Sequence, residues 1–185
     1  MRRGFALLAL VLGTLVASPT LMAADPVVTP VPSVDLDRYS GRWFEIAKYP
    51  NRFQKNCVGD TTAEYAKRPD GRLTVTNRCR RADGSFIDAV GVARPRDAKH
   101  PDATFKVRFA PAFLSFIPQV WGDYWILGLP ADYRYVVVGE PSRDYLWILS
   151  RTPQMSDEDY QAAVSVAVAN GYDPSRLVRT PQAAQ

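Results

Sequence analysis

The chain of 185 residues carries a formal net charge of +4 at pH 7, and two of its positive charges, Arg2 and Arg3, lie at the extreme N-terminus. Without these two the charge is +2 (4 − 2), which is too weak to indicate nucleic-acid binding and allows only loose attraction to an anionic lipid surface. The one histidine, His100, stands in a polar stretch without a spaced set of ligands, so we expect no metal ion and no cofactor.

The N-terminal residues have the layout of a secretory signal peptide. Met1–Arg3 is basic, Phe5–Val16 is a short apolar run, and Ala23 and Ala24 supply small residues for cleavage. The alternative is an N-terminal membrane anchor, but the run is shorter than the roughly 20 apolar residues needed to span a bilayer. We therefore predict an exported protein that loses residues 1–24 as its signal peptide.

Three parts are predicted after the signal peptide. Residues 25–33 contain three prolines and are expected to form an extended, mobile leader. Residues 34–180 form one domain, which is long enough to bury a single core, and residues 181–185 form a tail. Within the domain, Val34–Tyr39 is expected to form a short helical turn before the first strand.

Eight short strands are predicted next, separated by tight turns and with no helix between them. The first, residues 40–49, is opened by a glycine and ends at Pro50 and Asn51, which are typical turn residues. This arrangement favours an antiparallel sandwich or an up-and-down barrel. The other predicted strands are Thr61–Lys67, Arg72–Cys79, Phe86–Ala93, Phe105–Phe109, Tyr124–Leu129, Tyr133–Gly139 and Tyr145–Ser150.

The hydrophobic period then changes from that of a strand to that of a helix. Ser156 is a candidate N-cap, acidic residues fill the first turn, where the helix dipole favours them, and Gly171 stands where a C-terminal glycine belongs. The sequence thus predicts one amphipathic helix that covers one flank of a barrel. A last short strand is expected at Leu177 and Val178.

The inward faces of a closed sheet would mix apolar, small and polar groups. Asn77 alternates onto the same face as two aliphatic residues, and Tyr65, Val107 and Phe109 take the corresponding faces of other strands. An eight-stranded barrel is just wide enough to hold one small ligand. The mixture suits a cavity with an apolar body and a few polar anchors; the alternative is an ordinary packed core.

The two cysteines are expected to lie near each other. In an up-and-down barrel the connections alternate between the two ends, and Cys57 and Cys79 both fall at the end with the longer loops, near neighbouring strands. An exported protein matures where disulfides persist, so the pair forms one bridge or, as the alternative, remains two buried thiols.

The connection between the fifth and sixth predicted strands, residues 110–121, is unusually apolar. Its large side chains include Phe113, Leu114, Phe116 and Ile117. So apolar a loop at a barrel mouth needs a partner. Three possibilities are open: the loop folds in as a lid over the cavity, it contacts a membrane, or it packs against a second chain, which leaves the protein a monomer or a dimer.

Residues near both ends of the predicted sheet resemble a known family. Gly41–Ala47 resembles the Gly-x-Trp signature in the first strand of the lipocalins. Asp144–Pro153 resembles the last strand of the bacterial outer-membrane lipocalins, the subgroup related to apolipoprotein D. The resemblance covers residues 34–179. It implies an all-β fold, an eight-stranded antiparallel up-and-down barrel with one open mouth and one C-terminal α-helix packed outside.

The resemblance also implies roles for individual residues. Gly41, Trp43 and Arg151 would form the barrel floor, with the guanidinium of the arginine laid on the indole face. Tyr65 and Asn77 match positions that line the cavity in the family.

Two further candidates complete the expected ligand-binding set. Trp125 matches an indole in the cavity wall of the family. Glu45 shares the parity of Trp43 along the first strand, so we expect it to face the interior, where a buried carboxylate needs a partner or a raised pKa. The candidate ligand-binding residues are therefore Tyr65, Asn77, Val107, Phe109, Trp125 and Glu45.

The functional hypothesis is binding, storage or transport of a small hydrophobic amphiphile, a fatty acid or a lysophospholipid, in the bacterial cell envelope. No nucleophile–base set and no Gly-x-Ser-x-Gly motif occurs in the sequence, so we do not expect an enzyme. One alternative is a lipocalin-fold enzyme that acts on a lipid or carotenoid with Glu45 or Asp88 as base. Another is an envelope protein-interaction module that uses the apolar loop.

Two features depart from the family pattern. The second lipocalin motif is blurred at Pro130–Tyr133, which leaves the turn before the seventh strand open. Bacterial relatives are often anchored by a lipid on an N-terminal cysteine, and no cysteine precedes Cys57. We therefore expect a soluble periplasmic protein, with outer-membrane association as the alternative.

Overall fold

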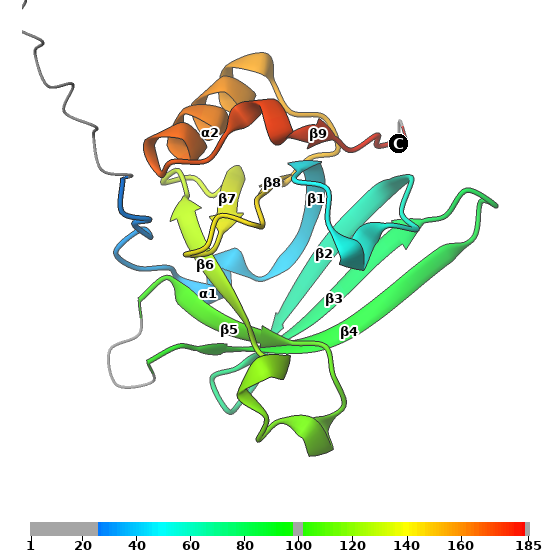
Figure 1. Cartoon of the computed structure of the whole chain (residues 1–185), viewed down its shortest axis with the longest axis vertical. Coiled ribbons are helices and arrows are strands. Elements are labelled where there is room, and N and C mark those ends of the chain that lie inside the picture. Colours follow the sequence, from blue (N-terminus) through cyan, green and yellow to red (C-terminus); the bar gives the residue numbers. More distant parts are fainter. Residues whose placement is uncertain (1–25, 98–101, 184–185) are drawn as a thin grey trace, which may run out of the picture.

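The chain forms a closed antiparallel barrel with one long helix outside it, as the computed structural model in Figure 1 shows. The structure describes residues 26–97 and 102–183, so the predicted signal peptide, residues 1–24, lies outside the described residues. The barrel strands are β1 (Gly41–Lys48), β2 (Gly59–Lys67), β3 (Leu73–Arg80), β4 (Phe86–Pro95), β5 (Thr104–Arg108), β6 (Gly122–Gly128), β7 (Tyr135–Gly139) and β8 (Trp147–Ser150).

The sheet closes because β1 pairs with strands on both of its sides. Each strand from β2 to β7 pairs with the next one along the chain, and β1 pairs with both β2 and β8. The prediction of an eight-stranded up-and-down barrel is therefore confirmed. A ninth, two-residue strand, β9 (Val178–Arg179), pairs with the end of β1, close to the position predicted for a last strand.

Short helices mark the connections. A four-residue helix, α1 (Leu36–Tyr39), precedes β1, and its first turn is capped by the side chain of Asp35, which accepts from two backbone N–H groups. Single 3-10 turns occur in three connections: η1 (Arg52–Gln54) after β1, η2 (Ala112–Leu114) and η3 (Pro118–Val120) between β5 and β6, and η4 (Pro174–Arg176) before β9.

The long helix α2 (Asp157–Ala169) begins and ends where the capping residues predict. The hydroxyl of Ser156 accepts a hydrogen bond from the backbone N–H of Asp159 at 3.1 Å, and Gly171 has φ +79° just beyond the last turn. The helix lies close to the sheet because β6 offers a glycine: a Cβ on Gly128 would stand 2.8 Å from a methyl group of Val166. No helix within residues 26–97 and 102–183 is long and apolar enough to cross a bilayer.

Two separate hydrophobic cores follow from this arrangement. One fills the inside of the barrel and the other lies between the sheet and α2. Alternation along each strand decides the core to which a side chain belongs. The inner core includes Trp43, Tyr65, Val75, Phe105, Ile126 and Leu149, and the outer core includes Ile46, Leu127, Val137, Ile148, Ala163 and Ala167.

The proline-containing leader is packed rather than mobile, which corrects the prediction. Val28 is 7% exposed and belongs to the outer core. The backbone N–H of Val31 donates to the carbonyl of Ile126 at 2.8 Å, and that of Thr29 donates to Asn170 Oδ1 at 2.7 Å. The leader therefore runs along β6 and the end of α2, because Val28 and Val31 find apolar surface there, whereas Val27 is 83% exposed.

The strand ends differ slightly from the prediction at β7 and β8. Tyr133 lies outside β7, in a left-handed conformation with φ +60°, and the guanidinium carbon of Arg38 lies 4.1 Å from the centroid of its ring. A residue with that φ cannot continue a strand. This turn is the one that the blurred second motif left open.

The predicted disulfide between Cys57 and Cys79 is present, with the Cα atoms 5.6 Å apart. It ties the long connection after β1 to the end of β3. The bridge also covers the rim at the end of β3, where Cys79 is only 4% exposed.

Removing the disulfide should destabilise the protein. The cysteines are separated by 22 residues, and a loop of that size restricts the unfolded chain enough to contribute about 3 kcal/mol. We expect the variant Cys57→Ala, Cys79→Ala to lose that amount in the free energy of unfolding, measured by urea denaturation with tryptophan fluorescence. The wild type in a reducing agent serves as the control and should show the same loss; an unchanged midpoint in both would contradict the prediction.

Candidate ligand-binding site

The end of the barrel near α1 is closed by the side chains of Trp43 and Arg151. Trp43 is fully buried, and its Nε1 donates to the backbone carbonyl of Tyr39 at 2.8 Å. The guanidinium carbon of Arg151 lies 3.8 Å from the centroid of the indole. The geometry is that of a cation–π stack in which the flat guanidinium covers the ring.

Four backbone carbonyls hold the Arg151 guanidinium in this position. Burial lowers the pKa of Arg151 from its ordinary value, yet the group stays charged because arginine starts so high. Gly41 begins β1 with φ +92°, in the region that favours glycine, and this turns the chain so that the carbonyls on either side face the guanidinium. The acceptors are the carbonyls of Arg38, Tyr39, Ser40 and Arg42.

Three tyrosines meet directly above this floor. The hydroxyl oxygen of Tyr124 lies 2.6 Å from that of Tyr39 and 2.8 Å from that of Tyr65. Burial raises the pKa of Tyr39 and Tyr124 well above the ordinary value and raises that of Tyr65 to about 12. All three are therefore neutral at physiological pH. Sequence reasoning found Tyr65 but missed Tyr39 and Tyr124.

The exposure of inward-facing residues rises from the floor toward the middle of β3 and β4 and falls again at Cys79, which the disulfide covers. On β3, Leu73 and Val75 are each 3% exposed, whereas Asn77 is only half-buried. On β4, Ala93 is 3% exposed and Ala89, which is paired with Asn77, is exposed. The barrel interior is thus sealed at the α1 end and open to solvent at the other end.

Val107 and Phe109 lie further along this wall. Val107 is half-buried, packs against the inner core and is paired with Ala93. Phe109 lies just beyond the end of β5, is 42% exposed, and its ring rests on the backbone of Gly91. It is therefore placed at the end of the wall and not within it.

The expected position of Trp125 in the cavity wall is wrong. The indole belongs to the outer core, where it lines a surface groove with Val28 and Arg143. Its neighbour Tyr124 takes the inward position, since Ile126 two residues later is fully buried in the inner core. Both residues are aromatic and half-buried, so the sequence does not show which of them faces inward. Strand alternation decides this only once the register of β6 is known.

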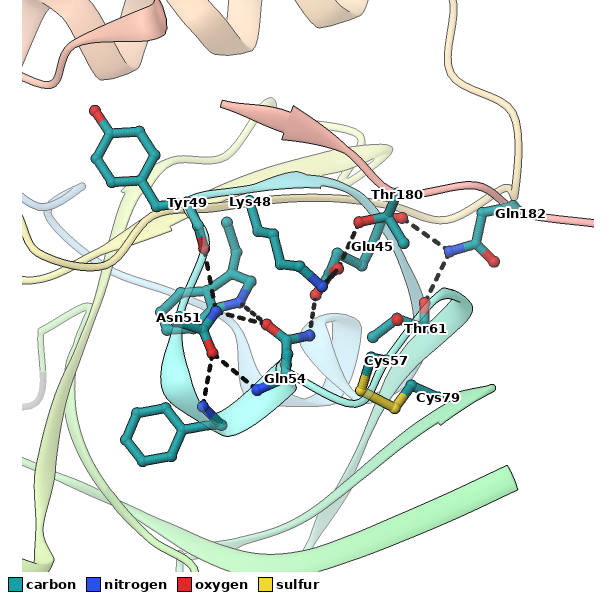
Figure 2. Close-up of polar contacts among 12 residues, drawn as sticks. Glu45, Lys48, Tyr49, Asn51, Gln54, Cys57, Thr61, Cys79, Thr180 and Gln182 are labelled. Carbon is teal, nitrogen blue, oxygen red and sulfur yellow. Dashed lines mark hydrogen bonds and ion pairs between the residues drawn. A yellow bond between two sulfur atoms is a disulfide. The ribbon is translucent and has the colours of Figure 1, made fainter. Parts of the chain in front are cut away.

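Glu45 is 2% exposed. Figure 2 shows its carboxylate among Lys48, Gln54 and Thr180. Its carboxylate accepts hydrogen bonds from Lys48 Nζ at 2.8 Å, Gln54 Nε2 at 2.5 Å and Thr180 Oγ1 at 2.5 Å. The amide oxygen of Gln54 in turn accepts from Trp147 Nε1 at 3.1 Å. The buried carboxylate therefore has the partners that its burial demands.

This carboxylate sits where the barrel seam is incomplete. β1 pairs with β2 only over Gly41–Phe44, and a register shift follows between Glu45 and Ala47. Beyond that point the C-terminal segment fills the gap: Gln182 Nε2 donates to the carbonyls of Glu45 and Thr61, at 2.8 and 2.9 Å (Figure 2). The rim is held by these side-chain bonds together with backbone bonds of the C-terminal segment, from Asp60 N–H to the Pro181 carbonyl at 2.8 Å and from Thr180 N–H to the Ile46 carbonyl at 2.9 Å.

The apolar loop between β5 and β6 folds back along the outside of the barrel. Trp121 lies between the guanidinium groups of Arg94 and Arg108, 4.3 and 5.3 Å from its ring centroid. These arginines alternate with the inward-facing Ala93 and Val107, so they mark the outer face. The loop therefore does not act as a lid in this structure, and Phe113 and Phe116 remain 74% and 79% exposed.

A closed eight-stranded barrel with one plugged end, one open end and a helix outside defines the lipocalin class of small-molecule-binding barrels. The family model described as a Lipocalin-like domain matches residues 34–182, and the chain belongs to the lipocalins. The resemblance predicted from Gly41–Ala47 and Asp144–Pro153 is confirmed.

Known proteins similar to this chain include a plant and a bacterial lipocalin. Temperature-induced lipocalin-1 of Arabidopsis thaliana is 47% identical over 154 residues, which cover 82% of this chain and 81% of that protein. Outer membrane lipoprotein Blc of Escherichia coli K12 is 38% identical over 156 residues, covering 84% and 83%. Among solved structures, insecticyanin of Manduca sexta has a TM-score of 0.66 at 22% identity, covering 86% of this chain and 87% of that one, which shows the shared fold.

The buried tyrosines predict a characteristic response to alkali. A folded-state pKa raised to about 12 for Tyr65, against about 10 in an unfolded chain, stabilises the fold at every pH below 10. That contribution is lost as the pH rises from 10 toward 12. We expect an ultraviolet phenolate titration of the nine tyrosines to show one group ionising near pH 10 and another ionising only with unfolding. The denatured chain is the control; a single step near pH 10 in the folded protein would refute the assignment.

Proposed function

We propose that this protein binds and carries a fatty acid or a lysophospholipid whose chain occupies the barrel above the tyrosines. Membership of the lipocalins implies a small hydrophobic ligand. The observation that carries the proposal is the gradient of exposure along β3 and β4, from Leu73 and Ala93 at 3% to the half-buried Asn77. Burial of the chain would supply about 0.8 kcal/mol for each methylene.

Arg81 is the side chain we assign to the polar head of the ligand. It shares the inward parity of Cys79 at the open end, and its buried Nε has no hydrogen-bond partner within the described residues. The arginines within β3 are held in ion pairs, Arg78 with Asp88 at 3.4 Å and Arg80 with Asp60 at 2.6 Å. Among the described residues, the side chain of Arg81, one residue beyond the strand, has only an electrostatic interaction with Asp83. A carboxylate or phosphate at the mouth would satisfy the guanidinium.

We assign no catalytic role to the buried carboxylate at the rim. Both carboxylate oxygens of Glu45 accept hydrogen bonds from side chains that hold the rim, which favours a structural role for this group. No group of three or more His, Cys, Asp or Glu side chains that could hold a metal ion occurs in residues 26–97 and 102–183. A binding protein accounts for these features better than an enzyme does.

We further propose that the protein works in the cell envelope, in the periplasm, with peripheral contact to a lipid surface. The similar protein Blc is an outer membrane lipoprotein by name, which supports the envelope. The exposed Phe113 and Phe116, with Leu114 and Ile117 beside them, support membrane contact, because rings this exposed at the tip of one loop leave apolar surface to be covered.

Filling the open end should abolish ligand binding. Ala89 faces the interior at its open end, whereas its neighbour Val90 is 63% exposed on the outer face. We expect Ala89→Trp to weaken binding of a fluorescent fatty acid by about tenfold or more, since the indole occupies the space of the chain. The matched control Val90→Trp should bind as the wild type does. Equal affinities for the two variants would place the ligand elsewhere.

Removing the exposed rings should release the protein from lipid. We expect Phe113→Ser, Phe116→Ser to reduce co-sedimentation with anionic phospholipid vesicles by about fivefold or more, because each ring loses buried apolar area. The control Val168→Ser, on the exposed face of α2, should sediment as the wild type does. If the double variant instead changes the molecular mass in solution, the loop packs against a second chain and the membrane proposal falls.

A further inference from the structure

A groove of about 370 Å³ lies on the outer face of the barrel, where the apolar loop leaves β5. Its wall includes Thr74 of β3, Val92 of β4 and Arg108 of β5, which are neighbours across three adjacent strands. These positions alternate with residues of the inner core, so the sheet separates this groove from the barrel interior. We call it the outer groove.

The outer groove has a positive charge. Arg68 and Arg108 both line it, and among the described residues that line it there is no aspartate or glutamate. Arg68 makes an ion pair with Asp70 at 3.4 Å, and both side chains of that pair are more than 40% exposed. A pair so open to solvent leaves the arginine free to meet another anion. The charge of the groove therefore favours an anionic ligand.

Arg108 is the residue that most favours a bound anion here. It is 8% exposed, and one of its Nη atoms donates to the carbonyl of Ala110. Its Nε is buried and has no hydrogen-bond partner within the part of the chain that the structure describes. A guanidinium has five N–H donors and binds phosphate through parallel hydrogen bonds. An anion in the groove would supply acceptors that the protein does not.

The outer groove is continuous with the exposed aromatic rings of the loop. Residues 110–112 line the groove, and Phe113, the next residue, is 74% exposed. At the other end of the loop the ring of Trp121 lies 5.3 Å from the guanidinium carbon of Arg108. Apolar groups of a peripheral protein lie about 5–10 Å deep, at the boundary of headgroups and acyl chains. A cationic groove beside such rings would lie level with the lipid phosphates.

We propose that the outer groove binds the phosphodiester of a phospholipid headgroup while Phe113 and Phe116 enter the apolar layer. This rests on the proposed peripheral contact with a lipid surface, to which it adds a specific site. Arg108 and Arg68 would bind the phosphate. A headgroup that also carries an ammonium meets no carboxylate on the groove wall, so phosphatidylglycerol should be preferred to phosphatidylcholine.

Co-sedimentation with two kinds of vesicle tests this proposal. One kind contains phosphatidylcholine alone, and the other contains phosphatidylcholine with phosphatidylglycerol. We expect the wild type to bind the mixed vesicles about fivefold more tightly, and Arg68→Gln and Arg108→Gln each to lose most of that preference. Binding of the variants to phosphatidylcholine alone should change little, because the rings remain.

Arg42→Gln is the matched control. It removes one arginine from the outer face of β1, where the side chain is 59% exposed and paired with Glu64 at 3.8 Å, so it leaves a carboxylate unpaired as Arg68→Gln does. It should keep the preference for phosphatidylglycerol. If it loses as much as the groove variants do, the attraction depends on overall charge and the outer groove is not a site.

A titration calorimetry experiment with inorganic phosphate, without vesicles, distinguishes a lipid headgroup from a free anion. We expect no saturable binding, because the rings must be anchored for the headgroup to be held. If inorganic phosphate binds the wild type and not Arg108→Gln, while the vesicle preference survives in both groove variants, the groove serves a free anion and the lipid proposal is wrong.

The outcomes separate this inference from the proposed function. If the wild type binds both kinds of vesicle equally, or if the groove variants keep the preference, the inference is wrong while membrane contact through the rings stands. If the wild type binds no vesicles, the proposed contact fails and the inference fails with it. If the buried Arg108→Gln does not fold by circular dichroism, Arg68→Gln, at an exposed turn, decides the matter.

Discussion

The stack of Arg151 on Trp43 gives the barrel two different ends. A guanidinium that loses water must keep its hydrogen bonds, and four carbonyls of α1 and β1 supply them while the indole face replaces solvent on one side. The same bonds attach α1 across the end of the barrel. Because this end is sealed, any ligand must enter from the opposite end. Each polar group on the inner wall therefore lies at a definite distance from the mouth.

The open end is held by weaker and more varied interactions. There β1 leaves β2, and the buried carboxylate of Glu45, the C-terminal segment and the disulfide of Cys57 and Cys79 take over from the strand ladder. A buried charge with three donors costs less than an unpaired one but contributes little net stability. The network mainly fixes the position of the rim, so that the mouth of the barrel stays open.

The polar groups inside the barrel form two levels. Near the floor, the hydroxyls of Tyr39, Tyr65 and Tyr124 are linked to one another, and near the mouth Asn77 and Arg81 are reached by solvent. Among the residues that the structure describes, apolar side chains of the inner core such as Val75 and Val107 lie between these two levels. This spacing is what an elongated amphiphile requires, with a charged head in water and an apolar body in the barrel.

Much of the architecture could be predicted because local signals agreed. Turn residues set the strand boundaries, Ser156 and Gly171 set the ends of α2, and the family signatures confirmed the topology. The site was predicted less well. Trp125 and Tyr124 are adjacent aromatic residues, and a shift of one residue in register exchanges their faces. Tyr39 was overlooked because it lies in a helical turn before the sheet and reaches the floor only through the fold.

The sequence by itself determined the strands and the outer helix, because these depend on periodicity and on the order of turns along the chain. The closed barrel was implied by the family resemblance, and the structure decided between a disulfide and two buried thiols. Only the tertiary structure decided which aromatic ring faces inward, that the leader packs along β6, and that the apolar loop lies along the outer face. These features depend on contacts between residues far apart in the chain, such as Val31 with Ile126 and Trp121 with Arg94. Local propensity carries no information about such contacts, because the partner surface exists only once the barrel has closed.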